Sequence, residues 1–473
     1  MIRDFLKSPA GVAGITILLL FSIISIVVVL SFPLDYGVRY WSNPKYWEDY
    51  PKLVPPVWYN YLVPYKFPRH YVYDLDKPTE MENGVKSWVF IYDFDADRFP
   101  TGIILKYQNL TFHGGYPLIS LIVKRPDDSV IHLLNFDPGI PPPRRDESPP
   151  YLRFIESPRT IIIRAEAQAL RNVVRFAETL GVQCTLTEVR NADLLTHIVF
   201  GKAVGEKCVS ESFQPLKGRY VFIVQLIGDP NDNIGNVRLV VQGGVYGLMG
   251  TDYLGRDLAQ GLMFGFPVAL FIGGVVALLA TLVGMALGII SGYVGGRLDE
   301  GIQRFADIMN NLPTLPLLIL FVFVLGRSLF NIIFVLVLFG WAGTTIIVRS
   351  MVLSIKSSPF IEAAKLAGAG RLWIMRKHIL PPVLPYSFAL MIFNVPGAIL
   401  AEAGLSFLGL GDPSIPTWGQ IMQQAFDNGA LQKQNFAWWW ILPPGLLIVL
   451  TAVGFVLVFF ALEPLVNPRL RRQ

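Results

Sequence analysis

Charged side chains are scarce in this chain of 473 residues. Asp, Glu, Lys and Arg together make up 16% of the sequence, whereas hydrophobic residues make up 52%. Ordinary soluble domains carry roughly 25% charged residues. The shortage excludes a chain that is soluble throughout and indicates a membrane protein. The charges that are present concentrate between positions 33 and 245, with long apolar runs on either side.

Several catalytic signatures are also missing. The sequence contains no G-x-x-x-x-G-K-[ST] phosphate loop, no H-E-x-x-H pair and no G-x-S-x-G elbow. Its five histidines are scattered, without the spacing that zinc sites use. No arginine-rich run interleaved with aromatic residues points to nucleic acid. We therefore expect no catalytic residue, no metal site and no nucleic-acid partner, and we do not expect an enzyme.

Six uncharged windows are long enough to cross a membrane, which takes about 20 apolar residues in a helix. They lie at 9–31, 258–296, 308–326, 328–348, 379–401 and 434–462. The second window is long for one span and short for two, so we expect a short interfacial helix leading into a single span. The first apolar run exceeds the 7–15 residues of a secretory signal and ends without an A-x-A site, so we expect it to be retained.

Cations in the short loops predict the orientation. With the N-terminus in the cytoplasm, thirteen loop cations lie inside and two, Arg327 and Lys433, lie outside. The inner set is Arg3, Lys7, Arg297, Arg304, Arg349, Lys356, Lys365, Arg371, Arg376, Lys377, Arg469, Arg471 and Arg472. We therefore expect a multi-pass plasma-membrane protein with both termini cytoplasmic and residues 33–245 extracellular.

Residues 33–245 have the pattern of a β-rich domain inserted between the first two spans. The stretches 117–134 and 218–244 both read as hairpins around a polar turn. One helix is expected at 163–180, ended by Gly181. A proline-rich loop at 138–151 divides the domain. The predicted organisation is thus 1–32 (cytoplasmic N-terminus and first span), 33–245 (β-sandwich with an inserted helix) and 246–473 (a five-helix membrane core).

The only two cysteines, Cys184 and Cys208, fall in this domain. On the oxidising side of a membrane such a pair is typical of a disulfide, although two unpaired core thiols fit the sequence as well. Asn109-Leu110-Thr111 is a glycosylation sequon, a tripeptide that often occurs by chance.

A charged, glycine-punctuated stretch, "SPFIEAAKLAGAGRLWIMRKHILPP", separates two membrane-length windows at 358–382. Pro359 opens a helix and Gly368 or Gly370 ends it, as helix boundary signals predict. A second short helix then leads to Pro381-Pro382. We expect a helix–turn–helix on the cytoplasmic face within residues 350–381, although a helix that only places its cations among lipid headgroups would look similar.

The motifs of this region resemble one family. Glu362-Ala363-Ala364, then Gly368, then Ile379-Leu380-Pro381 are similar to the EAA loop of ABC importer permeases. The segments "GTDYLGRD" (250–257), "SGYVGGRLDE" (291–300), "RFADIMNNLP" (304–313) and "ILAEAGLSFLGLG" (399–411) occur in the order of the C-type permease subunit of dipeptide/oligopeptide importers. Ala367 stands where that family usually has Leu, and segment 33–245 is unusually large for it.

This resemblance implies a type I ABC importer permease fold with six transmembrane helices. It implies that the EAA loop couples the chain to ATPases, so that ATP and Mg are cofactors of partner chains and not of this one. The implied partners are a B-type sister permease, two cytoplasmic ABC ATPase subunits, an extracellular solute-binding protein and the lipid membrane. The cargo would be a di- or oligopeptide or a related small solute such as an oligosaccharide.

Two further groups are candidates for functional roles. Asn394 and Glu402 lie in the fifth span, where Asn394, Pro396 and Gly397 could break the helix and open a translocation path; Glu402 fits a structural partner equally well. At the outer face, Thr251, Asp252, Gly255, Arg256 and Asp257 form a motif whose charges could hold a gate together or only stabilise the loop.

Two other classes of function stay open from sequence alone. An ion-coupled secondary transporter would need charges at the bilayer midplane and internal repeats. We find few such charges and no convincing repeat in the sequence. A membrane-anchored receptor would need only one or two spans.

Overall fold

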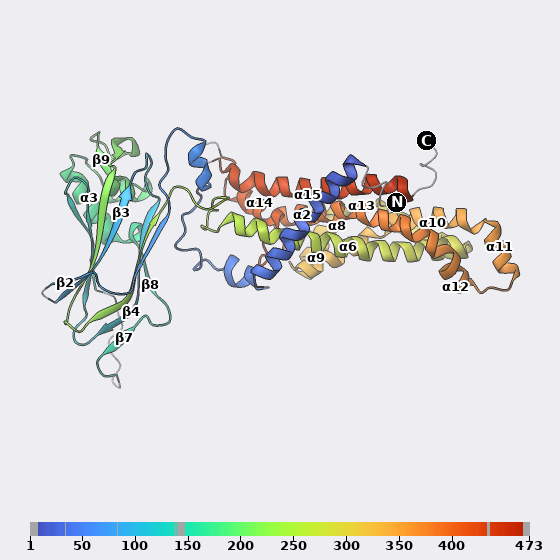
Figure 1. The fold of residues 1–473 in the computed structure, drawn as a ribbon, viewed down its shortest axis with the longest axis horizontal. Helices are drawn as coiled ribbons and strands as arrows, with labels where there is room; N and C mark the ends of the chain where they lie inside the picture. Colours follow the sequence, from blue (N-terminus) through green and yellow to red (C-terminus); the bar gives the residue numbers. More distant parts are fainter. Residues whose placement is uncertain are drawn as a thin grey trace. The chain divides into compact units, whose positions relative to one another are not determined.

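The computed structural model describes residues 8–33, 35–82, 84–137, 139, 147–432 and 436–466, and it separates into two compact units. One unit contains residues 1–44 and 258–473 and is helical; the other is β-rich and runs from Lys45 to Asp257 (Figure 1). The predicted inserted domain was 33–245, whereas the structure groups 33–44 with the helical unit and 246–257 with the β-rich unit. Most of the proline-rich loop and the terminal cations lie outside the described residues.

The helical unit is built from long apolar helices. Its elements are α2 (Pro9–Ser31), η1 (Gly37–Trp41), α6 (Leu258–Val294), α7 (Gly296–Asn311), α8 (Thr314–Leu325), α9 (Leu329–Gly340), α10 (Ala342–Lys356), α11 (Pro359–Leu366), α12 (Arg371–Ile374), η5 (Met375–Ile379), α13 (Leu380–Phe407), α14 (Trp418–Asp427) and α15 (Trp438–Val466). Five helical segments are long and apolar enough to span a membrane: 9–31, 258–294, 329–356, 371–407 and 438–464. The pair α7–α8 is bent by 88° and makes a sixth if it counts as one span.

Helix α6 differs from the sequence prediction. The expected interfacial helix followed by one span is wrong, because α6 is continuous over 37 residues, a length of about 55 Å at 1.5 Å per residue. Pro267 is accommodated inside the helix. A helix of this length exceeds the hydrocarbon core, which is about 30 Å thick.

Glycines bring α6 close to α10. A Cβ added to Gly284, Gly288 or Gly292 would lie 2.7–2.8 Å from the nearest atom of α10. In addition, the Thr345 hydroxyl of α10 donates to the Gly284 carbonyl at 3.1 Å. Small residues at four-residue spacing let two membrane helices approach and pack. This helix pair is therefore a rigid element of the unit.

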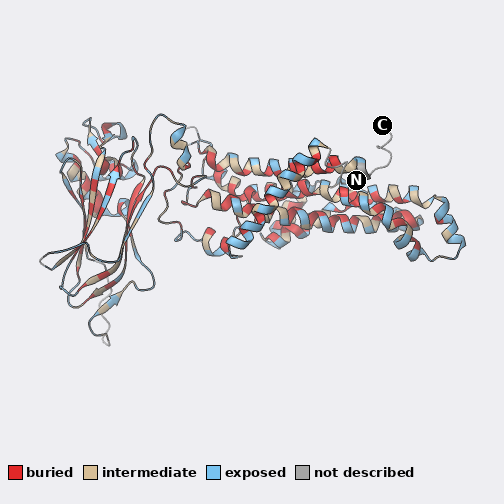
Figure 2. Ribbon diagram, in the orientation of Figure 1, coloured by how far each residue is buried: buried red, intermediate tan, exposed pale blue. Residues whose placement is uncertain are grey.

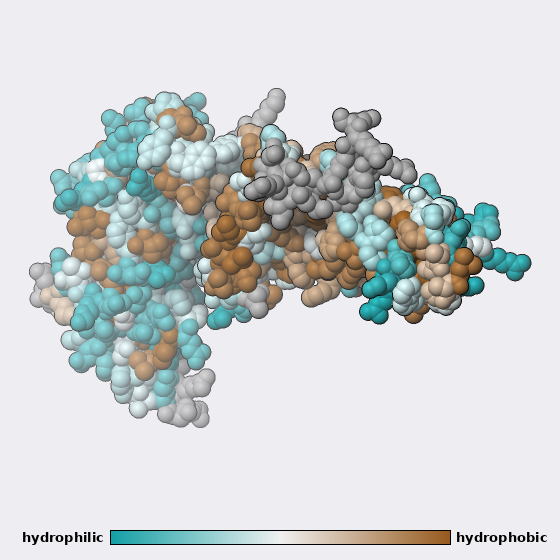
Figure 3. All heavy atoms as spheres, turned by 45° about the vertical axis from the view of Figure 1, so that its right-hand side comes forward, coloured by the Kyte–Doolittle hydropathy of each residue, from teal (hydrophilic) through white to brown (hydrophobic). Residues whose placement is uncertain are grey.

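The outward surface of the helices is apolar. Many large hydrophobic residues on α2, α8, α9 and α15 are exposed, and exposed positions, pale blue in Figure 2, recur along the helices. In the space-filling view, hydrophobic residues cover much of the visible helical surface, whereas the β-rich unit is mostly hydrophilic (Figure 3). Soluble proteins rarely expose apolar surface on this scale, so the helical unit is the membrane-embedded part of a multi-pass protein.

The β-rich unit consists of two antiparallel sheets around one core. One sheet has the order β1-β12-β4-β7 with β8 also paired to β4, and the other has the order β2-β3-β11-β5-β6. The strands are β1 (Tyr71–Leu75), β2 (Glu80–Glu82), β3 (Val85–Phe94), β4 (Gly102–Phe112), β5 (Leu118–Lys124), β6 (Val130–Phe136), β7 (Tyr151–Arg153), β8 (Arg159–Ile162), β11 (Gly218–Ile227) and β12 (Asn233–Gln242). A short pair, β9 (Gly201–Ala203) and β10 (Phe213–Pro215), stands apart.

Two of the three local predictions for this unit are confirmed. The hairpin expected at 117–134 is β5–β6, and the expected helix is α3 (Ala167–Thr179), followed by Gly181 at φ +81°. The hairpin expected at 218–244 is wrong: β11 pairs with β3 and β5, whereas β12 pairs with β1 and β4 in the other sheet. The turn at 228–232 therefore carries the chain from one sheet to the other.

Short helices and a disulfide complete the unit. They are η2 (Val57–Tyr61), η3 (Ile163–Ala165), α4 (Leu186–Asn191), α5 (Leu195–Phe200) and η4 (Ser210–Ser212). The structure joins Cys184 to Cys208 with a Cα–Cα distance of 5.0 Å. The bond ties the segment before α4 to the segment before η4.

Candidate functional site: a surface loop and a cavity in the helical unit

The loop between α10 and α13 is a helix–turn–helix, as its sequence predicts. Helix α11 begins at Pro359 and ends in a turn in which the Gly368 N–H donates to the Lys365 carbonyl and the Ala369 N–H to the Ala364 carbonyl, both at 3.0 Å. This pattern is a Schellman motif, which requires a left-handed residue after the helix. Gly368 supplies it with φ +81°. Gly368 therefore allows the backbone conformation that ends α11.

The loop is anchored on one side and exposed on the other. Ile361, Ile374 and Ile379 are buried in a cluster with residues of α6, α10 and α13. On the opposite side, Leu366 is 90% exposed and Leu372 is 75% exposed, and Phe360 and Trp373 are also exposed. Apolar side chains held out by a rigid turn are typical of a protein contact surface. We call these four exposed residues the apolar loop patch.

The predicted loop residues divide between these two sides. Glu362, Ala363 and Gly368 are exposed with the patch, Ala364 and Leu380 are half-buried, and Ile379 belongs to the anchor. Pro381 is exposed near the start of α13. A partner that presses on α11 would thus push on a loop that packs directly against α6, α10 and α13.

An ion pair connects α7 to α10. The Arg349 guanidinium donates to both carboxylate oxygens of Asp299, each at 2.6 Å. Asp299 also accepts from the Ser291 hydroxyl, and Gln303 donates to that hydroxyl at 2.8 Å. Such a two-pronged pair fixes orientation as well as distance. It joins the "SGYVGGRLDE" segment to the helix that leads into the loop.

A cavity of about 430 Å³ opens among α6, α7, α8, α9, α10 and α13. Asn394 lines it and donates a hydrogen bond to the Thr344 hydroxyl at 3.4 Å. Asn310 and Thr314 add further polar groups, and small residues line much of the remainder. A Cβ at Gly397 would meet nothing within 4 Å, so this part of the wall is open. The cavity thus gathers a few polar side chains in a lining that is otherwise apolar, inside the apolar helical unit.

Glu402 does not belong to the lining of this cavity. Its side chain is buried and accepts a hydrogen bond from the Ser406 hydroxyl at 2.6 Å. The helix break predicted near Asn394 is also absent, because α13 continues through Pro396 to Phe407. Asn394 therefore faces the cavity from an intact helix, whereas the Glu402 side chain is buried against Ser406.

The motif at 251–257 forms a closed loop within the β-rich unit. The Asp252 carboxylate accepts hydrogen bonds from the Leu254 and Arg256 backbone N–H groups at 2.9 Å and pairs with the Arg256 guanidinium. Thr251 donates its hydroxyl to the Pro51 carbonyl at 2.8 Å, and its backbone bridges to Asp257. Gly255 has φ +87°, which favours glycine. These contacts hold the loop's own fold together.

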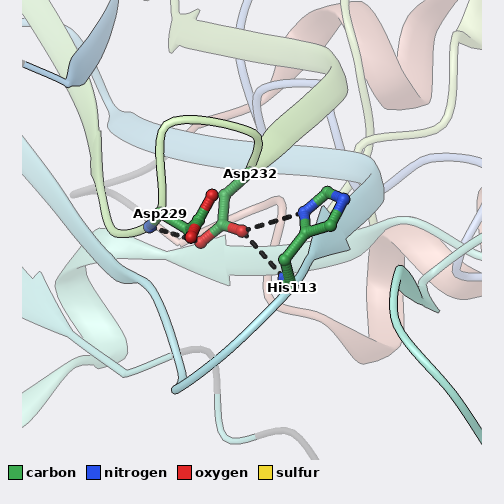
Figure 4. A group of neighbouring side chains, drawn as sticks. All are labelled: His113, Asp229 and Asp232. Carbon is green, nitrogen blue, oxygen red and sulfur yellow. Dashed lines mark hydrogen bonds and ion pairs between the residues drawn. The ribbon is translucent and has the colours of Figure 1, made fainter.

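One cluster in the β-rich unit has the composition of a metal site. His113, Asp229 and Asp232 place a ligand atom each within 4.8 Å of the others (Figure 4). However, Asp232 is buried and accepts from the backbone N–H of His113 at 2.9 Å and of Asp229 at 3.0 Å. These bonds fix the turn between the two sheets and account for both oxygens of Asp232.

Sequence reasoning missed the polar wall opposite Asn394. Asn310 and Thr344 stand in separate apolar windows, each next to a second residue of its own type, and only the packed helices bring them to one cavity. A search for amides and hydroxyls within apolar windows would have selected them.

Comparisons with known proteins agree with this arrangement. Residues 284–472 match the family described as binding-protein-dependent transport system inner membrane component. The dipeptide transport system permease protein DppC of Bacillus subtilis is 36% identical over 224 residues, which are 47% of this chain and 69% of that protein. The oligopeptide permease protein OppC of the same organism is 37% identical over 224 residues, 47% of this chain and 72% of that protein. The nickel permease protein NikC of Escherichia coli K12 is 35% identical over 226 residues, 47% of this chain and 79% of that protein.

Proposed function

The chain belongs to the family of binding-protein-dependent ABC transport permeases, and we propose that it carries di- or oligopeptides inward as the C-type subunit of an ABC importer. The peptide cargo is inferred from the relatives named for dipeptide and oligopeptide transport. Because a nickel permease is similar over a comparable stretch, the cargo requires direct measurement.

One observation carries the proposal: the exposed EAA loop is anchored to helices that line the polar cavity. Ile361 of the loop packs with Val348 and Val352 of α10 and with Val383 of α13. The same two helices contribute Thr344 and Asn394 to the cavity wall. A force on α11 would therefore reach the cavity through packed side chains, which is the requirement for switching between outward- and inward-facing states.

We propose that the apolar loop patch docks on an ABC ATPase. The ATPase would bind ATP together with Mg and hydrolyse the ATP, since this sequence has no phosphate loop of its own. Two such ATPases, a B-type sister permease and an extracellular solute-binding protein would complete the importer. The sister permease would close the cavity into a path that passes Asn394.

The proposed topology has six spans, with the bent pair α7–α8 as the third. Both termini and the EAA loop would then be cytoplasmic and the β-rich unit extracellular, as the loop cations predict. The β-rich unit would help dock the solute-binding protein or shape the outer vestibule. Deletion of 45–245 with unchanged uptake and unchanged affinity for the binding protein would contradict that role.

The two alternative functions have less support. The described residues include a buried Glu402 in the span region, but its hydrogen bond to Ser406 leaves it away from the cavity, unlike the coupling groups of a secondary transporter. A membrane-anchored receptor needs only one or two spans and does not require a cavity among several spanning helices.

The test is co-purification from the native host after mild solubilisation. We expect two ATPase chains and a second permease to accompany the wild type. Gly368→Asp and Gly368→Ala should lose the ATPases, because a side chain at φ +81° costs about 1–2 kcal/mol. The matched control is Gly370→Ala, since Gly370 has φ −64° and nothing within 4 Å of a Cβ.

Two outcomes would contradict the proposal. The chain could purify without ATPases, or the Gly368 and Gly370 variants could behave alike.

A further inference from the structure

The β-rich unit contains a cavity that is larger than the one lined by Asn394. Its volume is about 670 Å³, within the range of roughly 300–1,000 Å³ that small-molecule sites occupy. The walls are connections at one end of the sheets: the segment after β3, the end of β12, the start of α5 and the segment 210–215. Loops on a rigid scaffold are the usual carriers of binding residues.

The wall of this cavity combines apolar and polar groups, and several of them are firmly held. Phe213 and Pro100 are buried, and the His197 ring lies against Phe99 with 4.2 Å between the ring centroids. Burial lowers the pKa of His197, so its ring is neutral and adds no charge. Buried Gln242 is fixed by donating to the Tyr50 carbonyl at 2.9 Å.

The disulfide supports two of the walls. Cys184 precedes α4, the turn with Asp193 and then α5 with His197, and Cys208 precedes the segment with Glu211 and Phe213. A backbone bridge between Gln183 and Lys207 lies beside the disulfide. The two walls are therefore tied to each other independently of any ligand.

Charges of both signs surround the mouth. Asp97 pairs with Lys217, and Arg164 pairs with Asp193 at 2.9 Å, so these charges are already compensated. Three exposed groups remain: Lys52, Arg98 and Glu211. Among the described residues, neither Lys52 nor Glu211 forms an ion pair. The Arg98 guanidinium is held 4.5 Å from the centre of the Tyr65 ring.

We propose that this cavity binds a short zwitterionic peptide. Its carboxylate would meet Arg98 and Lys52, its ammonium group would meet Glu211, and its apolar side chain would enter toward Phe213. Both signs of charge at the mouth and the apolar part of the wall at Phe99, Pro100 and Phe213 suit a molecule with two charged ends and a hydrophobic side chain. The identity of this peptide with the transported cargo rests on the proposed function; the site itself does not.

The test uses the full chain in lipid nanodiscs, without ATPases. The probe is a pool of unmodified di- and tripeptides of alanine, leucine and phenylalanine, compared with the same pool after N-acetylation and C-amidation. Bound peptide is measured by equilibrium dialysis and mass spectrometry. We expect retention of the unmodified pool only, and at least about ten-fold weaker binding after Glu211→Gln or Arg98→Gln, since each removes a charge-assisted hydrogen bond.

Matched controls are available on α3. Glu178→Gln and Arg175→Gln remove exposed charges of the same kinds outside the cavity and should leave binding unchanged. The proposal is overturned if no peptide is retained, if capped peptides bind equally, or if the cavity variants match the controls. If the peptide were held in the helical cavity instead, the Glu211 and Arg98 variants would bind like the controls, because neither residue lines that cavity.

The result is separable from the test of the transporter assignment. If ATPases co-purify with the chain but no peptide is retained here, the importer assignment stands and this site is wrong. If peptide is retained and no ATPase is found, the peptide site stands and the importer assignment is wrong.

Discussion

Replacing Gly397 by Leu should block transport without destabilising the protein. Gly397 lies within α13 and lines the polar cavity, and a Cβ at this position has no atom within 4 Å. A leucine side chain would therefore project into the cavity without disturbing a packed neighbour. Glycine in a helix interior is about 1 kcal/mol less favourable than leucine-like residues, so the variant should be as stable as the wild type or slightly more stable.

The expected loss of function follows from the volume. The cavity measures about 430 Å³, and an added apolar side chain at Gly397 would take up part of that space. A rise of 1.4 kcal/mol in the barrier to passage already slows uptake ten-fold, so we expect at least about ten-fold slower uptake. The assay is peptide uptake into proteoliposomes that contain the complete importer, with thermal stability measured on the same preparation.

Gly274→Leu is the matched control. Gly274 also lies inside a long helix, α6, with nothing within 4 Å of an added Cβ, but it does not line the cavity. It should therefore gain the same helix propensity and keep full uptake. If Gly397→Leu transports as fast as Gly274→Leu, the cavity is not on the path and the assignment of Asn394 to that path is wrong.

Three further predictions concern packing, charge and pH. Gly288→Leu should lower the free energy of unfolding of the helical unit by about 3 kcal/mol in thermal or denaturant unfolding, because its Cβ would sit 2.7 Å from the Val348 Cβ; stability equal to that of Gly274→Leu would refute the close packing. Asp299→Asn should weaken ATPase stimulation and cost about 1–2 kcal/mol of stability by removing one side of the two-pronged pair with Arg349, and a double-mutant cycle with Arg349→Gln should show coupling rather than additivity. The β-rich unit should lose stability as the pH falls from about 6.5 to about 4, because burial lowers the pKa of His70 to about 4 against 6.5 when unfolded, so that the unfolded chain binds the proton first. The loss from His70 approaches about 3 kcal/mol, and His70→Phe should make that pH profile less steep in hydrogen-exchange measurements, leaving the contribution of His197.

The sequence was most informative where local rules apply. Apolar windows predicted where the long helices lie, because the cost of charges in a bilayer is local. Pro359 and Gly368 predicted the ends of α11, since the missing N–H of proline and the left-handed conformation of glycine act within one turn. The α3 helix and the β5–β6 hairpin were predictable for the same reason.

Features that depend on distant partners were not predictable. The turn at 228–232 reads as a hairpin, yet β11 and β12 join different sheets because each finds better partners far away in the chain. Hydropathy alone did not show that α6 continues for 37 residues or that α7 and α8 bend by 88°. The polar cavity was missed in part, because Asn310, Thr344 and Asn394 come together only in the packed bundle.

The central claim is that ATP hydrolysis in partner chains, transmitted through the loop at 359–380, drives solute across this subunit. The most direct test is uptake by proteoliposomes of the co-purified complex, with ATP supplied and the proton and sodium gradients collapsed. We predict that uptake continues, requires ATP and the solute-binding protein, and falls with Gly368→Ala but not with Gly370→Ala. Uptake that stops when the gradients collapse, while ATP is still present, would contradict the account.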